Sequence, residues 1–220
     1  MSNRQAVLWD LDGTLVDSGD YHWRAWSATM GLEGVRLARG DFDATFGQRP
    51  DTILSRWLGP DATPDRVARI AAAKEATYRR LVREGGLVPL PGAAAWIERL
   101  RRDGWKQAIA SSAPRANVDA VVDVLGWEGR FDALVTAEDV TAGKPDPQVF
   151  LVAADRLGVP PPRCIVVEDA VAGVEAARRA GMRSIGVGPA QWCEPDIAVP
   201  TLAGLSGDAF ERLLRPSGSA

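Results

Sequence analysis

The sequence predicts an α/β protein whose parallel β-sheet is interrupted, directly after its first strand, by an insertion made of helices. Two observations support this fold class. In residues 90–188, short apolar runs alternate with segments of helical periodicity, which is typical of a parallel sheet covered by helices on both faces. Between the first apolar run and Gly86, the chain offers three helical segments and no convincing strand.

The expected strands are short apolar runs bounded by turn residues. Five runs fit this description: residues 6–11, 107–110, 133–136, 164–167 and 184–187. The helices between them are expected to end at glycines, which adopt the left-handed backbone conformation that ends a helix. These glycines are Gly104, Gly126, Gly158 and Gly181. In the insertion, Thr63 and Pro64 are expected to begin the longest helix, as its N-cap and its first helical residue.

Size and composition favour a globular protein of the cytoplasm. The 220 residues suit one core domain that carries a smaller insertion. The net charge of -3 and the dispersed arginines leave no broad basic surface, so we expect no nucleic-acid partner. The first apolar run is too short for a signal peptide or a membrane span, so we expect no membrane association. Cys164 and Cys193 form no CxxC motif, which fits a reducing compartment, although a disulfide between them stays open.

The carboxyl ends of the expected strands carry a coherent set of polar side chains. Ligands of open parallel sheets bind beyond these ends. Carboxylates that crowd one edge would repel each other and raise each other's pKa. A hard divalent cation such as Mg²⁺ would relieve this repulsion, tether a phosphate oxygen and offset the charge that develops in phosphoryl transfer. The set comprises Asp10, Asp12, Ser111, Ser112, Lys144, Glu168 and Asp169.

The same residue types fit a phosphate group better than other ligands. Lys144 and the Ser111 hydroxyl could hold phosphate oxygens, with Ser112 beside them, and Gly13 would let backbone N–H groups approach closely. The sequence does not favour a Ser–His–Asp hydrolase, because His22 is the only histidine and no GxSxG motif is present. Singly, each residue could be a turn, cap or surface residue. Together, at strand ends, they favour magnesium-dependent phosphoryl transfer.

The order of these motifs resembles that of the haloacid dehalogenase-type phosphatases. The run DLDGTLVDS at residues 10–18 is similar to the family's first motif. Ser111, Lys144 and the Glu168–Asp169 pair fall where its second, third and fourth motifs are expected. The resemblance extends over nearly the whole chain. It implies a Rossmann-like α/β core domain at residues 1–15 and 88–220, with an inserted all-helical cap domain at residues 16–87.

The resemblance also implies a role for each residue of the first motif. Asp10 would be the nucleophile that becomes phosphorylated. Asp12 would be the general acid/base that protonates the leaving oxygen and then activates water. Mg²⁺ would be held by Asp10, the main-chain carbonyl of Asp12, Glu168 and Asp169.

Three residues of the insertion are candidates for substrate binding. Lys74 lies on the apolar stripe of its helix, so it either extends along that stripe to water or points towards a substrate. His22 is a lone histidine, which is more often structural, but its surroundings YHWRAW resemble those of the beta-phosphoglucomutases, where the histidine faces substrate. Arg49 lies in the run GQRPD, which resembles the substrate loop of the cap, and it could meet a second anionic group.

The expected function is the hydrolysis of a small phosphorylated metabolite, with a sugar phosphate as the preferred class. A beta-phosphoglucomutase-type mutase is the alternative, since His22 and Lys74 favour it. Two departures count against it: Ala113, Pro114 and Arg115 stand where the mutases have a serine–lysine pair, and Arg49 is displaced by one position. A non-enzymatic binding protein on the same fold is disfavoured by the intact motifs. Sequence leaves the oligomeric state and the exact substrate open.

Overall fold

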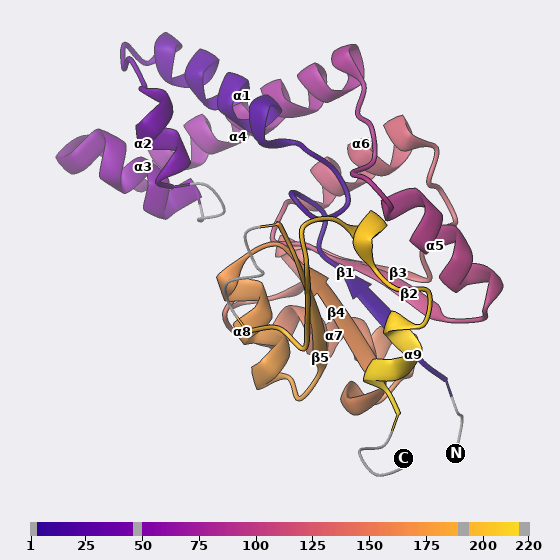
Figure 1. Cartoon of the computed structure of the whole chain (residues 1–220). Helices are drawn as coiled ribbons and strands as arrows, with labels where there is room; N and C mark the ends of the chain where they lie inside the picture. Colours follow the sequence, from indigo (N-terminus) through magenta and orange to yellow (C-terminus); the bar gives the residue numbers. More distant parts are fainter. Residues whose placement is uncertain (1–3, 46–49, 189–193, 216–220) are drawn as a thin grey trace. The chain divides into compact units, whose positions relative to one another are not determined.

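The computed structural model describes residues 4–45, 50–188 and 194–215. The chain forms two compact units, shown in Figure 1. Unit 1 consists of Met1–Asp17 and Leu87–Ala220, and unit 2 is Ser18–Gly86. Across the described ranges, none of the helices is long and apolar enough to cross a membrane.

Unit 1 is built on a six-stranded sheet with the strand order β3-β2-β1-β4-β5-β6. Every neighbouring pair of strands is parallel, which confirms the expected α/β class. The chain adds strands on one side of β1 and then returns to add β4 on its other side, so β1 and β4 lie where the winding direction reverses. The strands are β1 (Ala6–Trp9), β2 (Lys106–Ala110), β3 (Ala133–Val135), β4 (Cys164–Glu168), β5 (Arg183–Val187) and β6 (Ile197–Val199).

Two strands differ from the expectation. The first strand ends at Trp9 and not at residue 11, because the chain turns there: the Gly13 N–H donates to the Val16 carbonyl at 2.8 Å. The edge strand β6 was missed by the sequence analysis. It has only three residues, and an apolar run of that length is too short for periodicity to identify as a strand.

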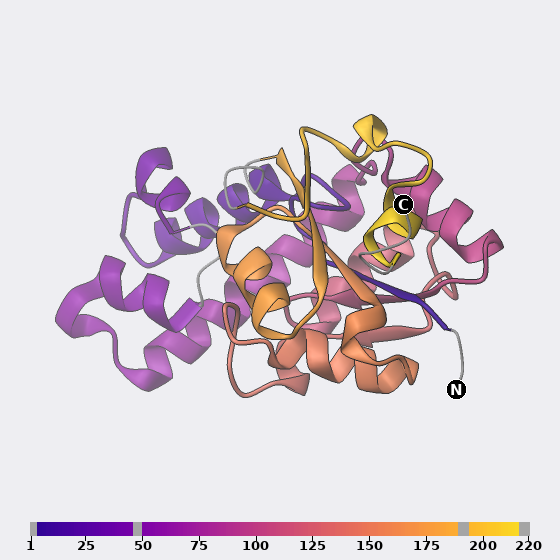
Figure 2. The same ribbon diagram turned by 60° about the horizontal axis from the view of Figure 1, so that its bottom comes forward.

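Helices cover both faces of the sheet. α7 packs on β1, β2 and β3, and α8 packs on β4 and β5. The opposite face carries α9, which lies in yellow on the other side of the strands in Figure 2. Gly126 and Gly158, both left-handed, end α6 and α7 as expected. The α-helices are α5 (Ala93–Arg102), α6 (Arg115–Leu125), α7 (Gln148–Leu157), α8 (Val171–Arg179) and α9 (Ala209–Leu213), and the 3-10 turns are η2 (Ala137–Asp139), η3 (Pro161–Arg163) and η5 (Leu202–Gly204).

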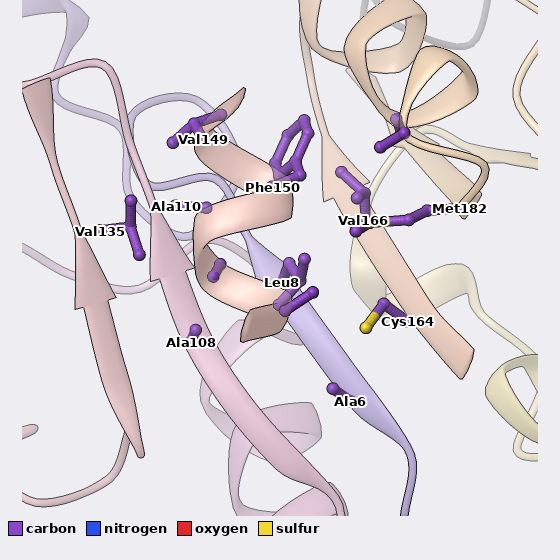
Figure 3. Packing of buried hydrophobic residues seen from close by; sticks show 14 of the residues in the cluster. Ala6, Leu8, Ala108, Ala110, Val135, Val149, Phe150, Cys164, Val166 and Met182 are labelled. Atoms are coloured by element: carbon purple, nitrogen blue, oxygen red, sulfur yellow. The ribbon is translucent and has the colours of Figure 1, made fainter. Parts of the chain in front are cut away.

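Each face of the sheet has its own packed core. Leu8 and Val166 point to the face of α7 and α8, where they share one hydrophobic cluster with the fully buried Phe150 of α7 (Figure 3). Trp9 points to the other face and contacts Phe210 of α9, with ring centroids 6.0 Å apart. Because side chains alternate along a strand, β1 supplies both cores and is buried throughout. The strand that leads into Asp10 is therefore covered on both faces of the sheet.

Unit 2 contains only helices in its described residues, as the insertion was expected to. It has four α-helices there and not three, because α2 is too short for its periodicity to be recognised in the sequence. Thr63 and Pro64 begin the longest helix as predicted. Seven residues form the buried core of this unit: Trp26, Met30, Phe42, Ile53, Leu54, Leu58 and Ile70. The helices are α1 (Gly19–Leu32), α2 (Arg39–Asp43), α3 (Pro50–Leu58) and α4 (Pro64–Gly85), with the 3-10 turn η1 at Gly59–Asp61.

Candidate active site

The candidate site begins with polar residues at the carboxyl ends of neighbouring strands. Asp10 follows β1 directly, and its backbone N–H donates to the Val167 carbonyl of β4 at 3.0 Å. Ser111 follows β2, and its N–H donates in the same way to Val135 of β3. Glu168 is the last residue of β4. Backbone hydrogen bonds between strands thus fix the starting points of these side chains at one edge of the sheet.

Lys144 joins two of the expected carboxylates. It lies in the loop before α7, with its side chain only 8% exposed. Its Nζ is 2.6 Å from Asp10 Oδ1 and 2.5 Å from Glu168 Oε1, and it faces the Phe150 ring at 5.0 Å. Burial by itself lowers the pKa of Lys144, but the charges of Asp10 and Glu168 outweigh it and raise that pKa above its usual value. Lys144 therefore stays protonated and charged.

Three carboxylates of this edge form a group that could hold a metal ion. Oxygen atoms of Asp10, Glu168 and Asp169 lie within 4.8 Å of one another. Burial raises the pKa of Asp10 well above its usual value; Lys144 lowers it in part, and the charges of Glu168 and Asp169 raise it further. Burial, and then the charge of Glu168, raise the pKa of Asp169 to about 7. An all-oxygen set of crowded, partly desolvated carboxylates fits a hard divalent cation.

The loop after β1 is shaped around Asp169. Gly13 has φ +89°, and a Cβ atom there would lie 2.1 Å from Asp169 Oδ2. The hydroxyl of Thr14 donates to Asp169 Oδ1 at 3.4 Å. Gly13 was expected to help bind phosphate. The structure shows a second reason for a glycine at this position, because any side chain here would collide with the Asp169 carboxylate. Thr14 was not singled out from the sequence, and its only signal was its place after Gly13 in the first motif.

The remaining candidates of unit 1 lie in the segments that follow β1 and β2. Ser111 is buried, and its Oγ accepts a hydrogen bond from the Ala113 N–H at 3.0 Å, so its O–H is the donor that a phosphate oxygen could use. Ser112 beside it is exposed. Asp12 is half-buried in the turn after β1, and its charge contributes to the raised pKa of Asp169. The phosphate-binding roles of these residues stay predictions.

In unit 2, two of the three candidates lie together. Lys74 is 4% exposed, so its side chain does not extend to water. Its Nζ is 2.9 Å from His22 Nδ1 and 3.0 Å from Glu75 Oε1, and the His22 ring stacks on Tyr78 with centroids 4.1 Å apart. A lysine ammonium can only donate, so His22 Nδ1 is the acceptor in this contact. Arg49, the third candidate, lies outside the described residues.

The raised pKa of Asp169 predicts a pH-dependent stability in metal-free protein. Between pH 3.8 and about 7 the folded chain holds a proton that the unfolded chain has lost, so stability falls as pH rises through this window. Asp169→Asn removes this partly buried charge. We expect it to raise the Tm in EDTA at pH 8 by at least about 2 °C, the effect of about 1 kcal/mol in a domain of this size.

The gain from Asp169→Asn should shrink as pH is lowered and vanish near pH 4. Asp123→Asn, at an exposed position of α6, is the matched control and should leave the Tm unchanged at both pH values. A lower Tm for Asp169→Asn at pH 8 would contradict the crowding of charges described here.

Comparison with known proteins agrees with this geometry. The chain is 33% identical over 190 residues to hexitol phosphatase B of Escherichia coli, covering 83% of this chain and 82% of that protein. It is 38% identical over 191 residues to the protein SUPPRESSOR OF QUENCHING 1, chloroplastic, of Arabidopsis thaliana. That match covers 83% of this chain but only 18% of the plant protein, which is much longer.

Solved structures share the fold over nearly the full length. The structure of CbbY from Rhodobacter sphaeroides in complex with phosphate superposes with a TM-score of 0.86 at 28% identity, covering 94% of this chain and 98% of that one. Beta-phosphoglucomutase from Clostridium difficile superposes with a TM-score of 0.84 at 27% identity, covering 96% and 97%. The family model of the haloacid dehalogenase-like hydrolases matches residues 5–181. The resemblance seen in the motifs is thus confirmed, and the chain belongs to the haloacid dehalogenase-like hydrolases.

Proposed function

We propose that this protein is a phosphatase that hydrolyses a small phosphorylated metabolite, preferably a sugar phosphate, with Mg²⁺ as its cofactor. One observation carries the proposal: the buried group in which Lys144 contacts both Asp10 and Glu168, with Asp169 beside them. It offers a carboxylate that could serve as nucleophile, a lysine ammonium, and oxygens that could hold a divalent cation. The phosphatase name of a relative at 33% identity supports it.

The proposed reaction has two steps on Asp10. In the first, a carboxylate oxygen of Asp10 attacks phosphorus, the bond from phosphorus to the ester oxygen breaks, and Asp12 gives a proton to the leaving oxygen. In the second, water attacks phosphorus and gives a proton to Asp12, the bond from phosphorus to the Asp10 oxygen breaks, and inorganic phosphate leaves with the Asp10 carboxylate restored. Lys144 holds Asp10 Oδ1, so the nucleophilic group is oriented before substrate arrives.

The remaining residues would bind rather than react. Asp10, Glu168, Asp169 and the main-chain carbonyl of Asp12 would hold Mg²⁺, which supplies Lewis-acid stabilisation of the charge on the transferred phosphoryl group. Ser111 and Ser112 would donate to phosphate oxygens, as would Lys144, and Gly13 would let neighbouring backbone N–H groups approach the phosphate closely. In unit 2, the proposed cap domain, His22, Lys74 and Arg49 would recognise the rest of the substrate.

A sugar-phosphate mutase is the second candidate. The contact of Lys74 with His22 favours it, as does the structural similarity to a beta-phosphoglucomutase. A phosphatase lets water complete the second step, whereas a mutase returns the phosphoryl group to the sugar. Incubation with β-glucose 1-phosphate separates them: a phosphatase releases inorganic phosphate, and a mutase accumulates glucose 6-phosphate. Release of phosphate from a panel of sugar phosphates, dependent on added Mg²⁺, is the direct test of the proposal.

The first prediction for this function concerns the nucleophile. Asp10→Asn should abolish turnover of p-nitrophenyl phosphate and of sugar phosphates, because an amide cannot accept the phosphoryl group. The fold should persist, since the change removes one charge from a crowded group. Steady-state phosphate release measures the effect, with mass spectrometry to exclude deamidation, and the exposed Asp123→Asn as a control that keeps wild-type rates. Substantial activity in a pure Asp10→Asn sample would refute the nucleophile assignment.

The second prediction concerns proton transfer. Asp12→Ala should slow phosphoryl transfer to Asp10 by about 10²–10⁴-fold for an alkyl phosphate, the usual contribution of a general acid. The loss should be smaller for p-nitrophenyl phosphate, whose leaving group needs little protonation. Single-turnover transfer measured on both substrates gives the comparison. Equal losses on the two would show that Asp12 does not act as the acid.

The third prediction concerns recognition by unit 2. Lys74→Ala should lower kcat/KM for the best sugar phosphate by the equivalent of about 1.5–3 kcal/mol, the value of a charge-assisted hydrogen bond. p-Nitrophenyl phosphate should be much less affected, because it offers no hydroxyl pattern. Arg80→Ala, on the exposed side of the same helix, should affect neither substrate. An equal loss on both substrates with a lower Tm would mean that Lys74 is purely structural.

A further inference from the structure

Glu168 is held from two sides by contacts that leave its carboxylate little freedom. It is 1% exposed. Lys144 Nζ contacts Oε1 at 2.5 Å, and the Ala170 N–H donates to Oε2 at 2.8 Å. A third side of the carboxylate is closed by the first turn of α8, where Gly173 lies.

The Glu168 carboxylate occupies the space that a side chain at residue 173 would need. A Cβ atom at Gly173 would lie 1.9 Å from Glu168 Cδ, 2.0 Å from Oε1 and 2.5 Å from Cγ. Atoms that are not bonded cannot approach so closely, so the Glu168 carboxylate occupies the volume in which any other residue would place its Cβ. Gly173 does not have a left-handed backbone, so conformational freedom does not explain the glycine. Glycine within a helix costs about 1 kcal/mol relative to alanine, so helix stability does not explain it either.

We propose that Gly173 is a positioning residue: its missing side chain is the slot that sets the Glu168 carboxylate against Lys144 and beside Asp10 and Asp169. The inference rests on the proposed function only for the role of Glu168 as a ligand of Mg²⁺. It adds to the site a residue that touches neither substrate nor cation. Gly13 does the same for Asp169, with an approach of 2.1 Å, but its left-handed backbone makes it a less clean test.

An alanine at residue 173 should move the carboxylate and leave the helix intact. The atoms that it would strike are the far end of a side chain, and alanine favours the helix. Because Oε1 is among the atoms struck, the displaced Glu168 should lose its contact with Lys144. The oxygen group formed with Asp10 and Asp169 would then be incomplete.

The test compares Gly173→Ala with Gly31→Ala. Gly31 is an exposed glycine of α1 with no atom within 4 Å of its would-be Cβ, so it controls for the change of residue type in a helix. Two quantities are measured: the Mg²⁺ concentration that gives half of the maximal thermal stabilisation, and kcat/KM for p-nitrophenyl phosphate at saturating Mg²⁺. Residues that orient metal ligands typically contribute about 10–100-fold to metal affinity or activity. Gly173→Ala should raise the half-maximal Mg²⁺ concentration by such a factor and lower kcat/KM, and Gly31→Ala should change neither.

A stability cycle keeps the inference testable if Gly173→Ala folds poorly. In the wild-type background the substitution collides with Glu168, whereas in a Glu168→Ala background the collision is gone and only the gain in helix propensity remains. The change in the free energy of unfolding caused by Gly173→Ala should therefore be more favourable in the Glu168→Ala background than in wild type. Urea unfolding in EDTA measures this free energy in both backgrounds. Equal effects in the two backgrounds would overturn the inference. So would a crystal structure of Gly173→Ala in which Glu168 keeps both its contacts.

The outcomes separate this inference from the proposed function. If wild type hydrolyses no phosphate ester and Gly173→Ala still weakens Mg²⁺ binding, the positioning role stands and the phosphatase proposal fails. If wild type is an active phosphatase and Gly173→Ala keeps its Mg²⁺ dependence and kcat/KM, the positioning role fails and the function stands.

Discussion

The crowding of buried carboxylates around one lysine is the constraint on which the rest of the site depends. Asp10 and Glu168 share the ammonium of Lys144, and an oxygen of Asp169 lies within 4.8 Å of theirs. Removing charged groups from water is costly unless they are paired, so this arrangement persists only because the surrounding backbone holds it. The glycine at residue 13 and the hydroxyl of Thr14 are parts of that support, since both act on Asp169.

The hydrophobic core below the site supplies the rigidity that such crowding requires. Phe150 is fully buried in one cluster with Leu8 and Val166, and its ring centroid lies 5.0 Å from Lys144 Nζ. The same helix, α7, thus packs against the sheet and places the Phe150 ring against Lys144. Since β1 and β4 are buried along their whole length, the carboxylates that follow or end them start from fixed backbone positions.

The sequence predicted the elements whose residues are neighbours along the chain. It did not reveal the contacts between residues that are far apart in the sequence. Apolar runs followed by acids located β1, β4 and the carboxylates at their ends, because both signals lie within a few residues. Gly173 could not be found in this way, because its role arises from the side chain of Glu168 folding back onto α8. The contact between His22 and Lys74 was equally hidden: each was recognised as a candidate, but 52 residues separate them on different helices.

The crowding also explains why a divalent cation belongs to the proposed mechanism. A nucleophilic Asp10 must be ionised, yet burial and the neighbouring carboxylates raise its pKa, and Lys144 offsets this only in part. A phosphate dianion approaching the same edge would add further negative charge. A divalent cation held by these oxygens favours the ionised form of each and lowers the repulsion felt by the substrate. The crowding that makes the group unfavourable alone would also suit it to a divalent cation. An ionised nucleophile beside a bound phosphate would require both the crowding and the cation.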